Sequence, residues 1–595
     1  PKPIVRGLIG FGAILLLSTL TSRYRWIGWD ETLMFYSAGG FLISAIAIGG
    51  RRRISETFFR FLAIQLLITN LIGVFLYDFF ENDPNTGSMV SWLYHRLAQG
   101  QFDFNTSLQS LLYTFTMSEG AMQSTILSRD FYAGFCILYL PFAMLLTIDP
   151  GPSRRPWAWR LTGGVTMMLT IVCVIKAQSK GEYIFGALVF TLFLAAIFFI
   201  DDLPQLRSRY ILALIAGILL VALATLWMMK PMLITRLKSL AVSVDSRSVI
   251  WNGSLHIFKD HPILGSGPGT FRIYFPRYRA PNYYDHEISN VTLFSHNYFL
   301  DLLCETGIFG FGFYLMALLA VAWIGLRNVL RHPDGRMRVM LLTALLGLLA
   351  IYGSNLSSPS GRWVIGASSL YTVLGLTIGL LAQARAAEAT LQADPPAPAQ
   401  GRRPAGRSAG SPTQTRWMQW RPMVYGAFLI PALILPFYGV QEGWLYFNSR
   451  IRHIDGVRAM TEGNRLLKAG QTPLETVQSL LNESVEQFNE ATRWDPTNYQ
   501  SYYQVASVYT TLAGIESARL SQLLGQRNVD QNQVAQQVAR VNQDFRLALD
   551  TYRKLAALWP DYAEIHYNLG LVFSGIARNI RFQQGLGLES AFQEH

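Results

Sequence analysis

The sequence predicts an all-α fold: a polytopic helical membrane protein with about eleven spans, a large extracytoplasmic loop and a C-terminal helical repeat domain. Hydrophobic residues make up 51% of the chain and charged residues only 15%. Apolar runs of roughly 17 residues or more recur along it, and each is long enough to cross a bilayer. After residue 450 the chain becomes polar and amphipathic. Together these observations exclude an ordinary soluble enzyme.

The apolar runs give the expected order of spans. They lie at 4–20, 31–50, 57–79, 131–148, 161–178, 183–200, 210–229, 296–326, 339–355, 365–382 and 422–440. Arginines gather in every second loop, and the positive-inside bias places those loops and the N-terminus in the cytoplasm. Residues 80–130, residues 230–295 and everything after 440 are then extracytoplasmic. The net charge of +12 therefore reports topology and not a nucleic-acid partner.

Composition divides the chain into four parts. Residues 1–382 form a transmembrane domain whose external loop spans 230–295, and residue 383 begins a linker to 421 that is rich in Ala, Pro, Gly, Ser and Arg. Such a composition is typical of a flexible segment. A final span at 422–440 then leads to a helical domain at 450–595. The linker itself is not expected to carry function.

The last domain contains two similar segments, offset by about 64 residues, in which Tyr503 corresponds to Tyr567 and Tyr509 to Phe573. This offset is close to two periods of the tetratricopeptide repeat, which repeats every 34 residues or so. The domain therefore resembles a tetratricopeptide array, although helical pairs of another kind remain an alternative. Such arrays bind partner proteins on a concave face.

The loop before the eighth span carries the first candidate site residue, Arg247. A cap at Asp245 or Ser246 would start a short helix there. One face of that helix carries Arg247, Trp251, Leu255 and Phe258. In the first turn, exposed backbone N–H groups favour an anion, and a guanidinium matches the oxygens of a pyrophosphate. The alternative is an interfacial helix that anchors on lipid headgroups.

A glycine-rich segment and more arginines follow. Gly265, Gly267 and Gly269 alternate along the chain, which indicates a tight turn or a close approach of backbone to another group. Arg272 then adds positive charge, with Arg277 and Arg279 close behind.

His296 is the second candidate, at the start of the eighth span. Ser295 is expected to cap the helix. At about 100° per residue, the histidine begins a stripe that continues through Leu300, Leu303, Gly307 and Gly310. It should then point inward at the external mouth of the spans, with Glu305 on the opposite side as a supporting residue. An ionisable group there is a functional candidate, although a lone histidine is more often structural.

These residues resemble the O-antigen ligases. His296 and Asn297, nine further residues, Gly307 and, after two more, Gly310 are similar to a motif of that family. Arg247 with Trp251 resembles its earlier Arg-led motif. The run Gly265, Gly267, Gly269 and Phe271 resembles the loop of the wider ligase and polymerase superfamily.

Two earlier segments agree with the resemblance more loosely. Arg129, Asp130 and Phe131 resemble a segment that opens a span, and Ser179, Lys180 and Gly181 resemble a Ser-Arg-Gly turn. The resemblance covers residues 1–382, and the odd number of expected spans departs from the even arrangement of the ligases.

The resemblance implies a glycosyltransferase that needs neither metal nor cofactor and acts at the outer face of the cytoplasmic (inner) membrane. It would move a glycan from a polyprenyl-pyrophosphate carrier to a lipid, glycan or protein acceptor, with inversion. His296 would act as the base and Arg247 as a catalytic cation. The residues expected to bind pyrophosphate or glycan are Lys180, Arg129, Arg272, Trp251, Gly267 and Asn297.

Three other functions remain as alternatives. A lipid-linked glycan flippase should carry charges along a path through its spans, whereas here they gather at one mouth. A membrane-anchored scaffold for the repeat domain would need fewer spans. A zinc hydrolase would use His256, His261 and His286, whose spacing matches no familiar metal motif.

Overall fold

A computed structural model describes residues 2–75, 128–199, 240–280, 283, 292–392, 444–445, 448–449, 451–470, 472–496, 498–525, 530–559 and 563–585. The expected spans at 210–229 and 422–440 and the end of the span at 57–79 lie outside these residues. The regular elements of this part of the chain are helices. The chain divides into two units, which we call the membrane unit (Pro1–Phe428) and the repeat unit (Leu429–His595).

The described part of the membrane unit contains eight helices that are long and apolar enough to cross a membrane. They are α1 (Lys2–Thr21), α2 (Arg25–Gly49), α3 (Arg52–Phe75), α6 (Arg129–Ile148), α7 (Pro156–Ala177), α14 (Tyr298–Arg331), α15 (Gly335–Ser354) and α16 (Val364–Gln392). A further apolar helix, α8 (Lys180–Phe199), coincides with the span expected at 183–200. The chain is thus a multi-pass membrane protein, as predicted, while the total of eleven spans stays a prediction.

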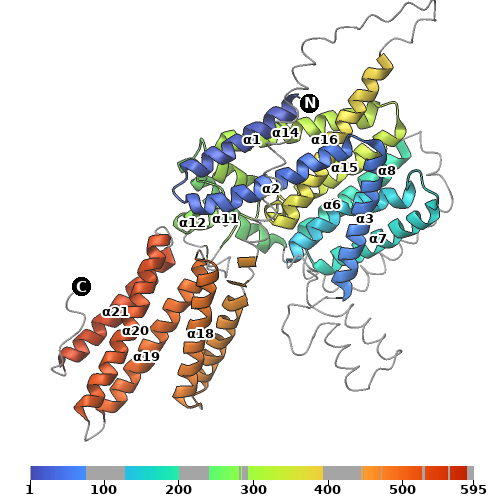
Figure 1. Cartoon of the computed structure of the whole chain (residues 1–595). Coiled ribbons are helices and arrows are strands. Elements are labelled where there is room, and N and C mark those ends of the chain that lie inside the picture. The colour runs from blue at the N-terminus through green and yellow to red at the C-terminus, as the bar shows by residue number, and fades with distance from the viewer. Residues whose placement is uncertain are drawn as a thin grey trace, which may run out of the picture. The chain divides into compact units, whose positions relative to one another are not determined.

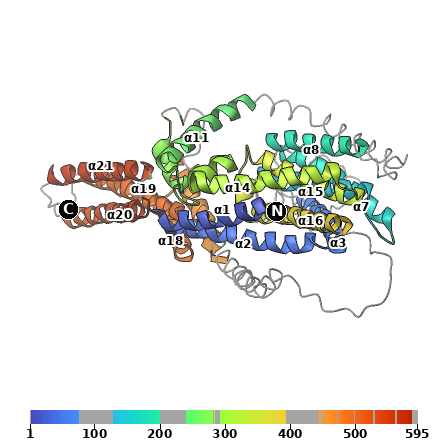
Figure 2. The ribbon, with the colours of Figure 1, turned by 90° about the horizontal axis from the view of Figure 1, so that it is seen from above.

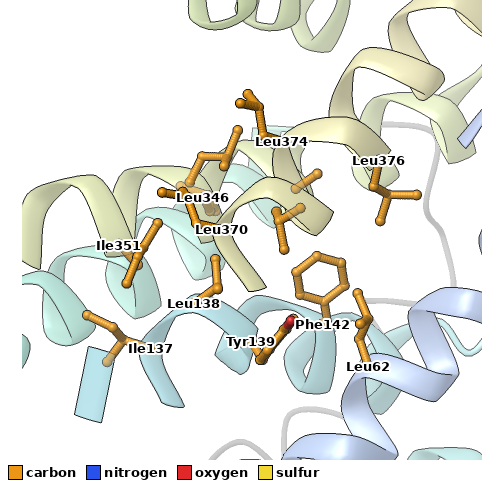
Figure 3. Close-up of a cluster of buried hydrophobic side chains, with 14 of the residues drawn as sticks. Leu62, Ile137, Leu138, Tyr139, Phe142, Leu346, Ile351, Leu370, Leu374 and Leu376 are labelled. Carbon is orange, nitrogen blue, oxygen red and sulfur yellow. The ribbon is translucent and has the colours of Figure 1, made fainter. Parts of the chain in front are cut away.

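Helix α6 lies inside this bundle and packs against α3, α7, α8 and α15 (Figure 1). Within its most apolar window 94% of the residues are buried, whereas the corresponding value for α14 is 28%. The core around α6 contains Phe142 and Leu138 against Leu346 of α15 and Leu370 of α16, with Leu62 of α3 at one side (Figure 3). The other long helices bury one face and leave large apolar side chains exposed, as lipid-facing helices do.

The connections at one end of the bundle are rich in arginine. We call this the basic end; it comprises residues 49–60, 149–156 and 331–338. Arg52 Nη1 lies 2.6 Å from Asp334 Oδ2, and Arg336 Nη1 lies 2.5 Å from Asp149 Oδ2. Arg60 Nη2 also donates to the Pro150 carbonyl at 2.8 Å. The expected clustering of basic loops on one side is therefore reproduced in space.

The opposite connections form what we call the loop end: the described residues of 21–31, 128–132, 177–182, 261–280, 283, 292–298 and 354–363. Here the segment that was expected to be external contains α11 (Leu240–Asp260), α12 (Phe271–Tyr274) and a 3-10 turn, η3 (Phe275–Tyr278). Helix α11 packs against α14 (Figure 2). A second 3-10 turn, η4 (Ser360–Arg362), connects α15 to α16.

Two boundaries differ from the expectations. Helix α16 continues to Gln392, so residues 383–392, which were assigned to the linker, are helical. Ala, Gln, Glu and Arg dominate this stretch, and all of them are strong helix formers. Helix α11 contains Asp245 and Ser246 in its interior, so neither residue caps a helix. Arg247 consequently does not lie in a first helical turn, and the expected contribution of free N–H groups beside it is wrong.

The repeat unit consists of antiparallel helices. A helix over 451–469 is followed by α18 (Leu474–Trp494), α19 (Tyr499–Leu524), α20 (Gln531–Leu558) and α21 (Ala563–Gly585). Phe488 and Leu481 of α18 pack against Val508 and Leu512 of α19. Two helices of 21 to 28 residues fill each repeat, whereas a tetratricopeptide array would place four shorter ones in that length. The tetratricopeptide assignment is therefore not confirmed.

Candidate active site

His296 lies in a tight turn before helix α14 and not on the helix itself. Its backbone φ is 58°, in the left-handed region, which is uncommon for a residue other than glycine. The next residue, Asn297, is the N-cap: its Oδ1 accepts from the amides of Phe299 at 3.0 Å and Leu300 at 3.2 Å. The expected cap at Ser295 and the expected helical stripe from His296 are thus wrong. Asn297 is among the best N-cap residues, and the helix begins after it.

The turn is held by neighbours on both sides. Ser295 Oγ accepts from the Asn297 amide at 3.1 Å, and the Ser295 amide donates to Asp301 Oδ1 at 2.8 Å. The amide of Tyr298 donates to the Asn355 carbonyl, at 2.9 Å, in the connection between α15 and α16. His296 is half-buried at the loop end.

Helix α14 is broken at Gly307, where φ is 65° and ψ is −172°. This backbone conformation is restricted essentially to glycine. The glycine-rich segment docks on the break: the Ile308 amide donates to the Pro262 carbonyl at 2.9 Å, and the Gly267 amide donates to the Glu305 carbonyl at 3.0 Å. A Cβ on Gly265 would overlap the Glu305 backbone. Both expectations for the glycines hold here, because the segment is a tight turn and it approaches another backbone closely.

A buried ion cluster lies beside the His296 turn. Arg362 of η4 has a side chain that is 2% exposed, and its Nη2 lies 2.9 Å from Glu305 Oε2. The same guanidinium lies 3.5 Å from Glu31 Oε2 and 3.6 Å from Asp301 Oδ2. Burial lowers the pKa of Arg362, but the three carboxylates outweigh burial and hold that pKa well above its usual range. Arg362 therefore stays charged.

Lys180 is the first residue of α8, two residues after a left-handed residue, Gln178. The neighbouring Ser179 Oγ donates to Asp130 Oδ1 at 2.6 Å, beside Arg129. Arg129 Nε in turn lies 3.8 Å from the same carboxylate oxygen. The Ser354 hydroxyl, at the end of α15, donates to Glu182 Oε1 at 2.5 Å. These contacts gather Arg129 and Lys180 into one corner, which we call the lysine corner (residues 128–130 and 178–182).

The connection from Asn355 to Trp363 joins the lysine corner to the His296 turn. On one side, a Cβ on Gly181 would overlap Ser357 Oγ, and Phe131 packs on Trp363 with ring centroids 5.1 Å apart. On the other, Asn355 and Arg362 bind the start of α14. The structure thus brings His296, Asn297, Lys180 and Arg129 to the same end of the bundle.

Arg247 and Trp251 lie on a half-exposed flank of α11. The buried residues of this helix are Ile250, Gly253, Ser254 and Ile257. Leu255, which shares the predicted face with Arg247 and Trp251, is 41% exposed. Arg247 forms no ion pair or hydrogen bond with another described residue, and Trp251 Nε1 is enclosed without a hydrogen-bond acceptor among them.

Arg272 is half-buried in α12, while Gly267 is buried beneath the turn and packs against Ser22. Next to them lies a cavity of about 380 Å³, lined among others by Arg23, Asp260 and Arg277. Burial, together with Asp260, raises the pKa of Tyr278 to about 12. The Tyr278 hydroxyl therefore stays protonated and donates to Asp260.

The sequence comparisons agree with this geometry. Residues 165–315, from the middle of α7 to the middle of α14, match the family model for O-antigen ligase. This part of the chain is similar to an O-antigen ligase domain. The match supports the resemblance seen in the motifs, and with it glycosyl transfer of the ligase or polymerase type. A search of curated proteins found no significant match to the chain.

The matched segment includes Lys180, Arg247, Arg272 and His296, and it ends before η4. Arg362 and Glu31 therefore lie outside it, and sequence reasoning missed both. One signal was present: Arg362 lies in a short polar connection on the side where the positive-inside bias predicts few cations. An arginine against that bias indicates a buried or functional role.

The histidines of the zinc alternative lie elsewhere. His256 is exposed on α11, and its Nδ1 lies 2.8 Å from the Asn252 carbonyl. His261 packs on Tyr274, with ring centroids 5.2 Å apart. His286 lies outside the described residues. Of the two described histidines, His256 thus contacts the backbone of its own helix, and His261 packs on an aromatic ring of α12.

Proposed function

We propose that this protein transfers a glycan from a polyprenyl-pyrophosphate carrier to an acceptor hydroxyl at the outer face of the cytoplasmic membrane. The observation that supports this most directly is the joining of the His296 turn and the lysine corner by the Asn355–Trp363 connection. A base and cations at one membrane-surface site are what such a transfer needs. The N-terminus would be cytoplasmic and the repeat unit extracytoplasmic.

In the proposed reaction His296 takes the proton of the acceptor hydroxyl. The acceptor oxygen forms a bond to the anomeric carbon, the bond from that carbon to the pyrophosphate oxygen breaks, and polyprenyl pyrophosphate leaves with the electron pair. Arg247 and Lys180 stabilise the negative charge that develops on the leaving group, with Arg129 and Arg272 nearby. Trp251 contacts the glycan. Asn297 and Gly267, expected to bind substrate, also shape the turn and the loop beside it.

The half-exposed imidazole suits this role, because a base must reach the acceptor from solvent while its neighbours hold it still. The charged side chains near His296, those of the lysine corner and of the Arg362 cluster, gather at the loop end, which favours surface chemistry over transport through the spans. A flippase would move the donor across the membrane whether or not an acceptor is present.

The test uses the full-length protein in liposomes with a polyprenyl-pyrophosphate glycan and, separately, lipid A core, free glycan and a protein as acceptors. We expect transfer to at least one acceptor, undiminished by a chelator, and a loss of at least about 1,000-fold in His296→Ala, since a general base contributes two to four orders of magnitude. The matched control is His256→Ala, on the exposed side of α11, which should keep wild-type rates. A fully active His296→Ala would refute the role of His296. Transfer to none of the acceptors, with donor movement across the bilayer, would favour the flippase.

The repeat unit is proposed to bind a partner protein, in keeping with its stacked helical pairs. Deletion of residues 450–595 should leave transfer to a small soluble acceptor unchanged if the unit only recruits a partner. Loss of that transfer would show that the unit belongs to the enzyme itself.

A further inference from the structure

We propose that Arg362 is a positioning residue, which fixes the His296 turn through Asp301 and holds it in register with the lysine corner. The catalytic part of this proposal rests on the proposed function. The positioning part concerns only the geometry of the turn. Arg362 is too deeply buried to touch a substrate, so it acts through the residues it binds.

The first link runs from Arg362 to the residue before His296. Arg362 Nη1 lies 3.6 Å from Asp301 Oδ2, and the other oxygen of that carboxylate accepts the Ser295 amide at 2.8 Å. One carboxylate oxygen of Asp301 thus faces Arg362, and the other binds the Ser295 amide. His296 follows Ser295 directly and has a left-handed backbone, which persists only where the surroundings determine it. The charge on Arg362 orients the carboxylate that holds this turn.

The second link runs from Arg362 to the break in α14. Its Nη2 lies 2.9 Å from Glu305 Oε2, while Glu305 Oε1 accepts the amide of Phe271, at 3.1 Å, at the start of α12. The Glu305 carbonyl also accepts from Ser18 Oγ of α1 at 2.8 Å. The segment of α14 that follows His296 is therefore tied to α1, α12 and η4 at one point.

The third link runs from Arg362 along its own connection. Seven residues earlier, Asn355 accepts the Tyr298 amide on its carbonyl, and its Oδ1 accepts from the Gly361 amide at 3.2 Å. Ser354, one residue before that, donates to Glu182 of the lysine corner. The same short segment consequently determines the positions of the proposed base and of the proposed pyrophosphate-binding cations relative to each other. A displacement of about 1 Å in such a pair can cost a hundredfold in rate.

The charge balance supports a dedicated role for this arginine. Glu31, Asp301 and Glu305 surround one guanidinium, and a second cation within 4.0 Å of these carboxylates is absent among the described residues. Removal of Arg362 would leave three carboxylates crowded together, which would push the start of α14 away from η4.

The experiment compares Arg362→Gln and Arg362→Lys with a matched control, Arg336→Gln, at the basic end. Arg336 also bridges helices through carboxylates, Asp149 and Glu56, but it lies in the first turn of α15 at the basic end, away from His296. Steady-state transfer is measured per folded enzyme in liposomes. We expect Arg362→Gln to lower kcat about 100-fold while the donor KM changes by less than about twofold. Arg362→Lys should recover part of the lost kcat. In Arg336→Gln both kcat and KM should stay within about twofold of the wild-type values.

A second readout does not depend on activity. Hydrogen exchange of the peptide covering 292–300 should accelerate at least about tenfold in Arg362→Gln and stay unchanged in Arg336→Gln, because only the former releases the Ser295 and Tyr298 amides. Unchanged exchange in that peptide, or a wild-type kcat in Arg362→Gln, would overturn the proposal. An equal fall of kcat in Arg336→Gln would do the same, since it would indicate a general loss of structure.

If Arg362→Gln does not fold, Asp301→Asn takes its place. It keeps Oδ1 as the acceptor for Ser295 and removes the attraction to Arg362. We expect about a tenfold lower kcat and faster exchange at 292–300, and wild-type values for both would overturn the proposal. If His296→Ala remains active while the Arg362 variants still loosen the turn, the proposed function fails and the positioning role stands.

Discussion

The basic end and the loop end of the membrane unit both join helices through arginine, but in opposite surroundings. At the basic end the side chains of Arg52 and Asp334 are 49% and 34% exposed. At the loop end those of Arg362 and Asp301 are 2% and 1% exposed. Exposed pairs contribute little to stability, whereas a broken buried pair leaves a charge without solvent or partner. Substitution of one partner of an exposed ion pair at the basic end should therefore cost little stability. Substitution in the buried cluster at the loop end should cost much more and disturb the His296 turn.

The largest expected difference between the two ends is in stability. Arg362→Ala should lower the free energy of unfolding by about 3–5 kcal/mol, because three buried carboxylates lose their cation. Arg52→Ala should cost about 1 kcal/mol or less, since Asp334 is 34% exposed and keeps access to water. Reversible unfolding in mixed micelles measures both. Equal losses would remove the contrast between the ends.

Helix α14 runs from one end to the other, and its glycines provide the next comparison. Gly307→Ala should cost about 1–3 kcal/mol and most of the transfer activity, because alanine does not tolerate this backbone conformation. Gly312→Ala is the control, since a Cβ there meets no atom within 4 Å. Thermal unfolding and transfer rates measure both variants. A harmless Gly307→Ala would mean that the break is not needed.

The two ends also offer matched helix caps. Asn297 accepts two amides at the start of α14, and Asp334 accepts two at the start of α15. Replacement of either by alanine should cost about 1 kcal/mol. Only Asn297→Ala should also reduce kcat, because only that cap adjoins His296. Similar activity losses in both variants would contradict a special role for the loop end.

The smallest expected effect is the response to salt. The stabilisation that Arg52 contributes, measured as the difference between wild type and Arg52→Gln, should fall from about 0.5 kcal/mol at low ionic strength towards zero at 0.5 M salt. The cost of Arg362→Lys should stay constant over the same range, since the cluster is shielded from ions. The measurement is the free energy of unfolding of each variant and of the wild type over a range of salt concentrations. A strong salt response of the Arg362 variant would indicate that water reaches the cluster.

The spans and the basic end could be predicted because each follows from many residues together, so that an error at one position does not change the prediction. Long apolar runs and alternating arginines carry that information redundantly. The position of His296 at the mouth of the spans was predicted, but by a helical stripe that does not exist. One residue decided the difference: Asn297, not Ser295, caps the helix.

The loop end could be predicted only in part, because its contacts join residues that are distant in sequence. Arg362 binds Glu31 and Glu305, and no local pattern connects these positions. The break at Gly307 was also hidden, since a glycine in an apolar run is equally typical of close helix packing. The motif indicated which residues matter, and the fold supplied the physical reasons for their spacing.

The break in α14 has a consequence for how the protein responds to its membrane. The helix has 34 residues, about 50 Å at 1.5 Å per residue, which exceeds the roughly 30 Å thickness of the hydrocarbon core. A continuous rod of this length would swing its outer tip whenever a thicker or thinner bilayer changed its tilt. With a joint at Gly307, the inner segment re-tilts while the outer segment stays fastened to the glycine-rich loop. The proposed site at the loop end would then keep its position when the lipid composition, and with it the bilayer thickness, changes.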